Sequence, residues 1–361
     1  MIYARHFVIL QTLFLASQSL AQEHGGLKLF WHANSFAFSE AMPVAQLIDE
    51  LKGAPPNKGD IAFTYNKSEL GVALNDFELS FFQRYDYYIE FSPDTIGLWY
   101  GVENAKDIDK NRVFDILLQA NHQRSSGATL AYTHKFDQSF QVKLAVSYLH
   151  ADRLVDGVLA GSVSTSDEDY VGDIYVDYNY TEDILFDREV EPVNGDGYAL
   201  DVFLAWDAND QLLINLALED LVSEIIWDQV PVTTGRLSSD RVDLNDDGTI
   251  TSKPNLTGNQ GFRDYTQRLP VRADLKARYQ FGQRYAGVAR WQRYEDFDYP
   301  SIGVTYSANK KSNMEVTYNF VTQGAMLAFQ SRSYSFHVLS DQFSLKRAKT
   351  LSIGFSLHWP L

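Results

Sequence analysis

The last twelve residues of the chain, 350–361, alternate between apolar side chains and small or polar ones. One face carries Leu351, Ile353, Phe355, Leu357, Trp359 and Leu361, and the other carries Ser352, Gly354, Ser356 and His358. Successive side chains of a β-strand point to opposite sides, so this period of two predicts a strand with one apolar face. A half-buried strand of a water-soluble sheet shows the same pattern, so this strand alone does not establish a membrane wall.

The same period recurs in segments spread along the chain, such as 77–91, 140–148, 271–281 and 313–320. Each is apolar on one face and polar or charged on the other, which is typical of the wall of a transmembrane β-barrel. The sequence therefore predicts an all-β fold, a transmembrane antiparallel β-barrel of about 14 strands, with about 12 to 18 strands compatible with the pattern.

Residues 1–21 have the organisation of a secretory signal. Arg5 supplies the positive charge, the segment from Phe7 to Ala16 is apolar, and small residues precede a predicted cleavage site before Gln22. The apolar segment is shorter than the roughly 20 residues that a spanning helix needs. An exported chain without a longer apolar run can cross a membrane only as strands of a closed barrel.

Two kinds of connection separate the predicted strands. Short connections, expected to be periplasmic turns, lie at 137–138, 207–210, 282–283 and 308–311. Longer polar connections, expected to be outer loops, lie at 154–169, 181–196, 230–268 and 340–349. The predicted parts of the chain are the signal peptide 1–21, an N-terminal segment 22–58, and the barrel 59–361 with a long outer loop at 229–268.

One segment departs from the two-residue period. Val44, Leu47, Ile48 and Leu51 are spaced as on one face of an α-helix, which predicts an amphipathic helix over 40–52. Two interpretations remain open: a plug helix inside the barrel mouth, or a short helix packed on the periplasmic rim.

Composition limits the class of partner. The chain has no Cys, which excludes disulfides and thiolate metal sites. Its formal net charge of −16 argues against nucleic acid as a partner and against docking on an anionic leaflet. An aromatic content of 14% fits girdles of Tyr, Trp and Phe at two membrane interfaces.

The closing strand also carries a resemblance. Ser352, Gly354, Leu357 and Trp359 resemble the signal that the bacterial outer-membrane insertion machinery reads on the last strand of its substrates. The resemblance implies that this machinery is a partner and that the protein lies among the lipids of the outer membrane of a Gram-negative bacterium.

A second resemblance covers the region 195–227 and the Leu269-Pro270 pair that opens the strand after it. Both resemble the superfamily of outer-membrane barrels that includes the FadL, PorV and TraF types. The resemblance implies a channel or uptake protein for a small solute, with hydrophobic solutes among the candidates. The alternative is a non-transporting barrel that supports secretion or assembly of other envelope proteins, as in the PorV and TraF types.

The most specific local motif begins at Asp243 and reads Asp-x-Asn-x-Asp-Gly. Asp243, Asn245, Asp247 and Thr249 have the spacing of the first ligands in a calcium-binding loop. The twelfth position is Pro254, where such loops place a bidentate Glu. The motif therefore predicts a weak calcium site or, alternatively, a turn rich in Asp and Asn.

Charged residues on the polar faces of the strands are expected to point into the lumen. They are Arg84, Asp86, Arg272, Asp274, Lys276, Arg278 and Arg290. One interpretation is a charged lumen that selects permeants. The other is a lumen closed by ion pairs between these residues, as in barrels that fill their interior with side chains.

The sequence gives little support for catalysis. It contains no Gly-x-Ser-x-Gly elbow, no His-Glu-x-x-His and no phosphate-binding loop, and so predicts a protein that is not an enzyme. His122, His134 and His150 fall near strand ends. An outer-membrane hydrolase stays open as a third hypothesis, since catalytic residues need only meet in space.

Overall fold

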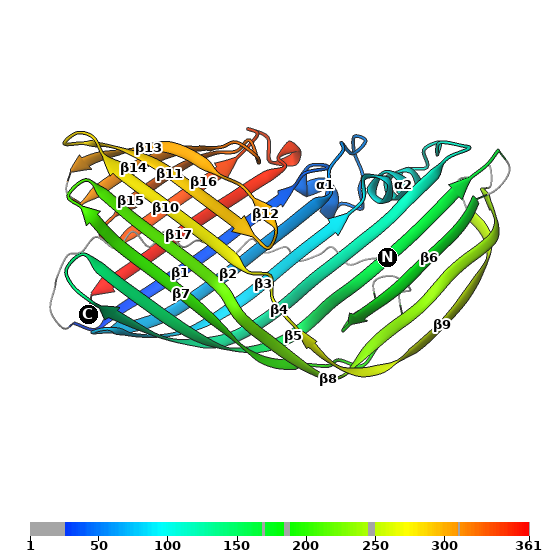
Figure 1. The fold of residues 1–361 in the computed structure, drawn as a ribbon, viewed down its shortest axis with the longest axis horizontal. Coiled ribbons are helices and arrows are strands. Elements are labelled where there is room, and N and C mark those ends of the chain that lie inside the picture. The colour runs from blue at the N-terminus through cyan, green and yellow to red at the C-terminus, as the bar shows by residue number, and fades with distance from the viewer. Residues whose placement is uncertain (1–25, 168–169, 184–187, 245–249, 310, 361) are drawn as a thin grey trace.

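The structure, a computed structural model, describes residues 26–167, 170–183, 188–244, 250–309 and 311–360. Within these residues fourteen antiparallel strands close into a barrel, which confirms the predicted fold class (Figure 1). Around the wall these strands are β1 (Lys28–Ser39), β2 (Ile61–Leu74), β3 (Phe77–Phe91), β4 (Val113–Lys135), β5 (Phe140–Thr165), β7 (Gly195–Asn209), β8 (Leu212–Leu244), β10 (Arg272–Gln280), β11 (Tyr285–Tyr294), β13 (Ser301–Asn309), β14 (Ser312–Asn319), β15 (Ala325–Ser331), β16 (Tyr334–Ser340) and β17 (Thr350–Pro360). The remaining elements are β6 (Tyr170–Tyr180), β9 (Ile250–Gln267), β12 (Phe297–Asp298), α1 (Val44–Ile48), α2 (Pro93–Glu103) and the 3₁₀ turn η1 (Leu345–Arg347).

The first and last strands close the barrel. β17 pairs with β1 from Lys28 opposite Pro360 to Phe38 opposite Thr350. The small or polar residues of β17 at 350, 352, 354 and 356 are buried toward the lumen, as their alternation predicts. Because β1 is a wall strand, the predicted N-terminal segment 22–58 is not separate from the barrel.

The outside of the barrel carries a band of exposed apolar side chains. It includes Leu70, Leu79, Phe81, Leu130, Leu144, Val146, Leu275, Ile302, Val304, Met314, Val316, Leu327, Phe336 and Val338. Exposed Tyr and Trp side chains accompany it, among them Tyr132, Tyr148, Tyr198, Trp206, Tyr279, Tyr285, Trp291, Tyr318, Tyr334 and Trp359. A closed wall with an apolar exterior and aromatic side chains at its borders is a transmembrane barrel. No helix among the described residues is both long and apolar enough to cross a bilayer.

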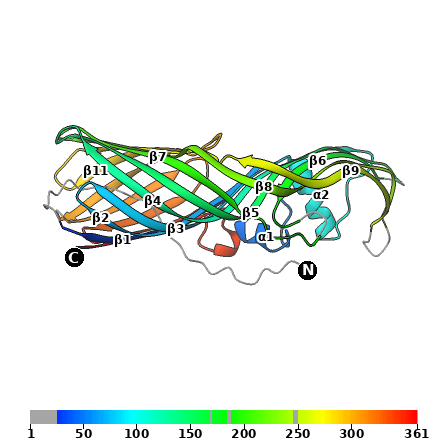
Figure 2. The same ribbon diagram turned by 90° about the horizontal axis from the view of Figure 1, so that it is seen from below.

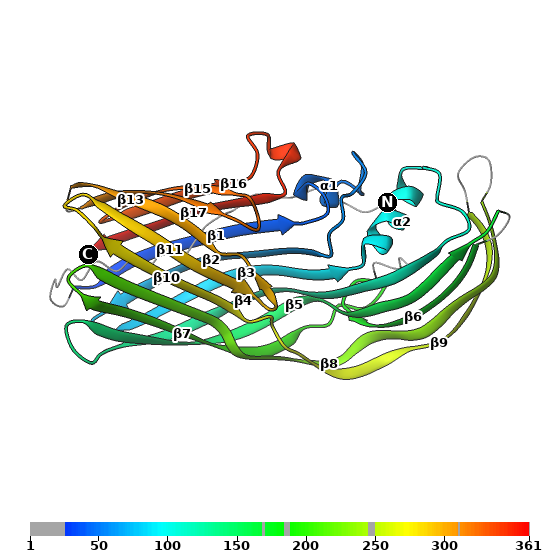
Figure 3. The same cartoon turned by 45° about the horizontal axis from the view of Figure 1, so that its top comes forward.

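The two ends of the barrel differ. The end that holds residues 28 and 360, here called the terminal end, has short turns, whereas strands at the opposite, distal end extend far beyond the wall (Figures 1 and 2). There β6 pairs with β5 and β8, and β9 pairs with β8, forming an outer sheet (Figure 3). The predicted loops 154–169 and 229–268 are therefore largely strands. Their Val and Thr residues favour extended backbone. Pairing of the first segment with β4 and β6, and of the second with β6 and within its own hairpin, satisfies that backbone.

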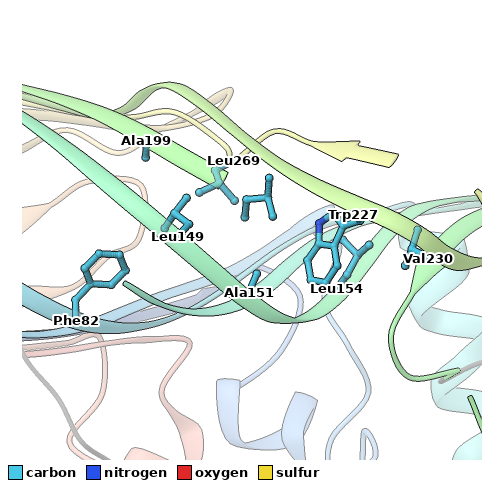
Figure 4. Close-up of a cluster of buried hydrophobic side chains, with 9 residues drawn as sticks. Phe82, Leu149, Ala151, Leu154, Ala199, Trp227, Val230 and Leu269 are labelled. Carbon is cyan, nitrogen blue, oxygen red and sulfur yellow. The ribbon is translucent and has the colours of Figure 1, made fainter. Parts of the chain in front are cut away.

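β8 exchanges one neighbour midway along its length. Residues 212–219 pair with β10, and residues from 225 onward pair with β9 instead. A bulge in β8 lies at this change of neighbour. Between two successive pairings with β7, residues 218 and 222 of β8 are four apart, whereas their partners 202 and 200 on β7 are two apart. Asp220 in the bulge has a positive φ of 58°, a conformation that Asp adopts more readily than most residues. An apolar cluster that includes Trp227 and Leu269 packs beside this point (Figure 4).

The helix α1 is shorter than predicted and lies outside the barrel wall. It spans 44–48 rather than 40–52, and the positive φ of Glu50 and Leu51 ends it. Leu51 and the partly buried Leu47 pack in a cluster with Ala62 and Phe91, which share the outward face of their strands with the lipid-facing Leu70 and Phe81. The plug interpretation of Val44, Leu47, Ile48 and Leu51 is therefore wrong. The helix is a rim element at the distal end, opposite the short turns that were predicted to be periplasmic.

Candidate functional site

An aromatic layer crosses the lumen toward the distal end. Its members are Phe36, Phe38, Phe63, Tyr65, Tyr88, Tyr294, Phe297 and Tyr299. The ring centroids of Phe63 on β2 and Tyr294 on β11 are 5.1 Å apart in an edge-to-face arrangement. β2 and β11 lie opposite each other, with six strands between them by either route around the wall. Side chains from opposite walls therefore meet, and the lumen is filled at this level.

A layer of buried charges lies directly beneath the aromatic rings. The two terminal nitrogens of Arg84 donate to the two carboxylate oxygens of Asp220, each at 2.6 Å, and its Nε donates to Asp86. Arg272 donates to the same Asp220 carboxylate at 3.4 Å, and its guanidinium stands 4.7 Å from the ring centre of Tyr65. These groups are almost fully buried, so each charge depends on its partners for stability.

The bulge in β8 builds this charged layer. By adding two residues, it turns both Glu219 and Asp220 toward the lumen, where both interact with Arg272. The backbone N–H of Asp220 donates to the carboxylate of Asp201 on β7 at 2.8 Å, which holds the bulge in place. On the opposite edge of β8 the ladder is interrupted, and the N–H of Leu269 donates to the hydroxyl of Ser223 at 3.0 Å. Among the described contacts, the wall is thus closed there by two hydrogen bonds between the Ser223 hydroxyl and the backbone of Leu269, and by the buried Leu269 side chain.

Below the charged layer, a cavity of about 160 Å³, lined by both charged and apolar side chains, extends toward the terminal end. Lys276 donates to both carboxylate oxygens of Glu315 at 2.8 Å, and Arg290 pairs with Asp274. Arg278 differs from these, since it donates to the side chain of Gln280 at 3.2 Å and has no carboxylate within ion-pair distance among the described residues. The cavity therefore combines neutralised pairs with one positive group.

All seven lumen residues predicted from the sequence point inward. Arg84, Asp86 and Arg272 belong to the charged layer, and Asp274, Lys276, Arg278 and Arg290 line the cavity. The pairs favour the interpretation in which opposite charges close the lumen over the one in which free charges select permeants. Sequence reasoning missed the aromatic layer and the acidic partners Asp220 and Glu315. The adjacent Glu219 and Asp220, which interrupt an apolar strand, were the available sign of a bulge.

The calcium motif falls mainly outside the described residues. Asn245, Asp247 and Thr249 lie outside them, and only the backbone of Asp243 is described, paired with that of Thr251. β8 ends at Leu244 and β9 begins at Ile250, so the residues that follow Thr249 run along β9. No group of three or more His, Cys, Asp or Glu side chains suited to a metal occurs in the part of the chain that the structure describes. Calcium binding stays a prediction.

Two histidines among the described residues meet part of the requirement for a hydrolase. Inside the lumen, His337 Nε2 lies 3.1 Å from Ser352 Oγ, and no carboxylate is hydrogen bonded to this imidazole among the described contacts. His150 Nδ1 lies 2.9 Å from Asp196 Oδ1 on the outward face, and Ser126 stands opposite His150 on the neighbouring strand. Catalysis by such a group requires the serine hydroxyl to bond with the histidine. Among the described residues, Ser126 and His150 form no hydrogen bond, whereas Tyr148 also donates to Asp196. The group is an interfacial cluster at the edge of the apolar band.

Comparison with known proteins gives matches only among solved structures. No family model and no curated protein matches the chain. The toluene transporter TodX of P. putida is 9% identical with a TM-score of 0.45, covering 94% of this chain and 91% of its own. A Pseudomonas aeruginosa FadL homologue is 11% identical with a TM-score of 0.38, covering 92% and 88%. The outer-membrane channel DcaP of Acinetobacter baumannii is 9% identical with a TM-score of 0.24, covering 93% and 97%. The fold assignment rests on the strand pairing described above.

Proposed function

We propose that this protein is an outer-membrane channel that admits small apolar solutes and that the structure represents its closed state. The observation that carries the proposal is the aromatic layer inside the barrel. Inward positions of a water-filled barrel are usually polar. Here Phe and Tyr side chains occupy them at one level, and such a lining suits apolar or aromatic solutes rather than ions.

Two layers block the lumen in the closed state, the aromatic layer and the charged layer, and they differ in how readily a solute can pass them. The aromatic rings can separate by side-chain rotation, because no covalent or hydrogen-bonded link joins Phe63 to Tyr294 among the described contacts. The charged layer below is costly to open, since Arg84 and Asp220 lose their partners when they part. A solute that passes the rings meets either this layer or the interrupted ladder beside Leu269, which is the more weakly bonded of the two.

The test is entry of a small apolar fluorescent naphthylamine into intact Gram-negative cells, whose outer leaflet slows such probes. We compare cells without the protein, cells with the wild type, and cells with the double variant Phe63→Ala/Tyr294→Ala. The variant removes the rings that meet across the lumen, so probe entry should exceed that of the wild type. Ion conductance of the purified variant in planar bilayers should stay at the wild-type value, because the charged layer remains.

Tyr285→Ala is the matched control, since Tyr285 lies on the same strand as Tyr294 but is half exposed on the outside of the barrel. Its probe entry should equal that of the wild type. Heat-modifiable migration on gels verifies that each variant is folded. The proposal fails if folded wild type and folded double variant both admit the probe no faster than cells without the protein.

A specific observation also supports the second candidate, a non-transporting barrel that supports other envelope proteins. Two filled layers block the lumen, and the outer sheet offers an extended surface beyond the wall (Figure 3). Replacing residues 229–268 with a tight turn distinguishes the two functions. If the protein is a channel, cells with the shortened variant should admit the probe as fast as cells with the wild type. If it is a supporting barrel, the deletion should abolish assembly of the envelope protein that depends on it, and probe entry should equal that of cells without the protein for both wild type and variant.

A further inference from the structure

The connection between β16 and β17, residues 341–349, lies outside the wall beside α1 (Figure 2). Two backbone hydrogen bonds fasten it there: the N–H of Val44 donates to the carbonyl of Ala348, and that of Ser39 donates to the carbonyl of Lys349, both at 2.9 Å. The carboxylate of Asp341 accepts from the N–H groups of Lys349 and Thr350, each at 3.0 Å. The connection is therefore a fixed part of the distal rim. We call it the rim loop.

The rim loop exposes two large apolar side chains. Phe343 is fully exposed and Leu345 is 67% exposed, while Ile48 of the adjoining α1 is 47% exposed. On the two strands that the rim loop joins, the outermost apolar residues on the outward face are the exposed Val338 and the partly exposed Leu351. The rim loop thus continues the lipid-facing surface past the end of the strands. Exposed apolar side chains at this height suit the interface between acyl chains and headgroups.

Two basic side chains adjoin these apolar ones. Lys346 and Arg347 form the end of η1, both are exposed, and neither makes an ion pair among the described residues. Lys349, in contrast, points back to the protein and donates to the carbonyl of Glu40 at 2.6 Å. In a chain of net charge −16, two unpaired positive groups beside an apolar anchor form a local exception to the acidic surface.

We propose that the rim loop binds phosphate-bearing lipids of the leaflet at the distal end. Phe343 and Leu345 enter the interface, and Lys346 and Arg347 contact the phosphate oxygens, for which guanidinium and ammonium groups are the usual partners. The net charge of the chain excludes electrostatic docking of the whole protein on an anionic leaflet. The net negative charge does not prevent Lys346 and Arg347 from contacting lipid phosphates once the barrel is inserted in the bilayer. The inference is independent of whether the barrel transports a solute.

The first experiment measures lipid binding by the full-length mature protein. Nanodiscs are prepared from phosphatidylcholine with a small fraction of diphosphorylated lipid A, and native mass spectrometry counts the lipid A that stays bound after release from the disc. Lys346→Gln/Arg347→Gln should bind about 30-fold more weakly, the factor expected for two basic side chains at an anionic surface. The matched control is Arg284→Gln/Lys311→Gln, which removes the same charge from exposed turns at the terminal end and should bind as the wild type does.

The second experiment locates the rim loop by spin labelling, which the absence of Cys makes specific to one site. A label at Phe343→Cys should be more accessible to oxygen than to a water-soluble nickel complex, as expected within the interface. A label at Asp107→Cys, an exposed position in the connection after α2, should show the opposite preference. The proposal is overturned if the label at 343 is as water-accessible as that at 107. It is overturned equally if the two double variants lose lipid A to the same extent, or if wild type retains none.

Discussion

The buried pair of Arg84 and Asp220 provides the sharpest test of how the lumen is held together. Arg84→Met keeps most of the side-chain volume and removes the charge, leaving Asp220 with one partner, Arg272, at 3.4 Å. Removing one member of a buried ion pair costs about 3–5 kcal/mol, because the other charge stays buried without compensation. We expect Arg84→Met to lower the free energy of unfolding by this amount.

The exposed pair of Arg124 and Asp152 is a matched control. Its guanidinium also makes two hydrogen bonds to one carboxylate, at 2.7 and 2.6 Å, but its side chains are 47% and 46% exposed. The corresponding exposures for Arg84 and Asp220 are 5% and 1%. Arg124→Met should therefore cost less than about 1 kcal/mol, since water screens an exposed pair.

The assay is equilibrium unfolding in urea from lipid vesicles, followed by tryptophan emission. The double variant Arg84→Met/Asp220→Asn completes a cycle. It also removes the charge of Asp220, and Asn tolerates the positive φ at that position, so it should recover part of the stability that Arg84→Met loses; the carboxylate of Asp86, which also pairs with Arg84, stays without that partner. If Arg84→Met and Arg124→Met cost the same, burial does not set the strength of these pairs. If the double variant is less stable than Arg84→Met, the uncompensated carboxylate of Asp220 is not the cause of the stability that Arg84→Met loses.

Three other predictions concern the outer sheet, the calcium motif and the closing strand. Burial raises the pKa of Asp156, in the outer sheet, from 3.8 to about 6. The folded protein therefore binds the extra proton between these pH values and loses stability as the pH rises through this window. Asp156→Asn should be more stable than wild type by up to about 3 kcal/mol at pH 8 and unchanged at pH 3, as measured by protection of outer-sheet amides. Asp247→Ala should abolish the heat that wild type releases with millimolar calcium in calorimetry, and identical traces would remove the predicted site. Leu357→Asp/Trp359→Asp should leave the protein unfolded in the periplasm, because both positions face outward on the closing strand; normal membrane assembly would contradict that assignment.

The barrel was predictable because its dominant signal is local. An alternating pattern within one segment fixes which face meets lipid, and the apolar outward and small inward residues of β17 follow it from 350 to 357. The same two-residue alternation predicts that Arg84, Lys276 and Arg290 point into the lumen. Their partners were not predictable: Arg84 and Asp220 are 136 residues apart, and only the closed ring of strands brings them together.

Two segments misassigned from the sequence, β1 and α1, carry apolar residues on faces where the barrel pattern does not place them. On β1, Phe36 and Phe38 face the lumen while Trp31 and Ala33 face outward, so apolar residues occupy both sides and the alternation is lost. The helix pattern of 44–51 had the same ambiguity, because an apolar stripe records that a face is covered without recording which surface covers it. In this barrel the aromatic side chains inside replace water in the lumen, and the helix outside replaces lipid on the wall. The aromatic layer puts apolar side chains inside the lumen, where the barrel pattern predicts polar ones, and it carries the proposed function. The helix α1 puts protein on the outer wall, where the pattern predicts lipid, and it adjoins the rim loop proposed to bind lipid.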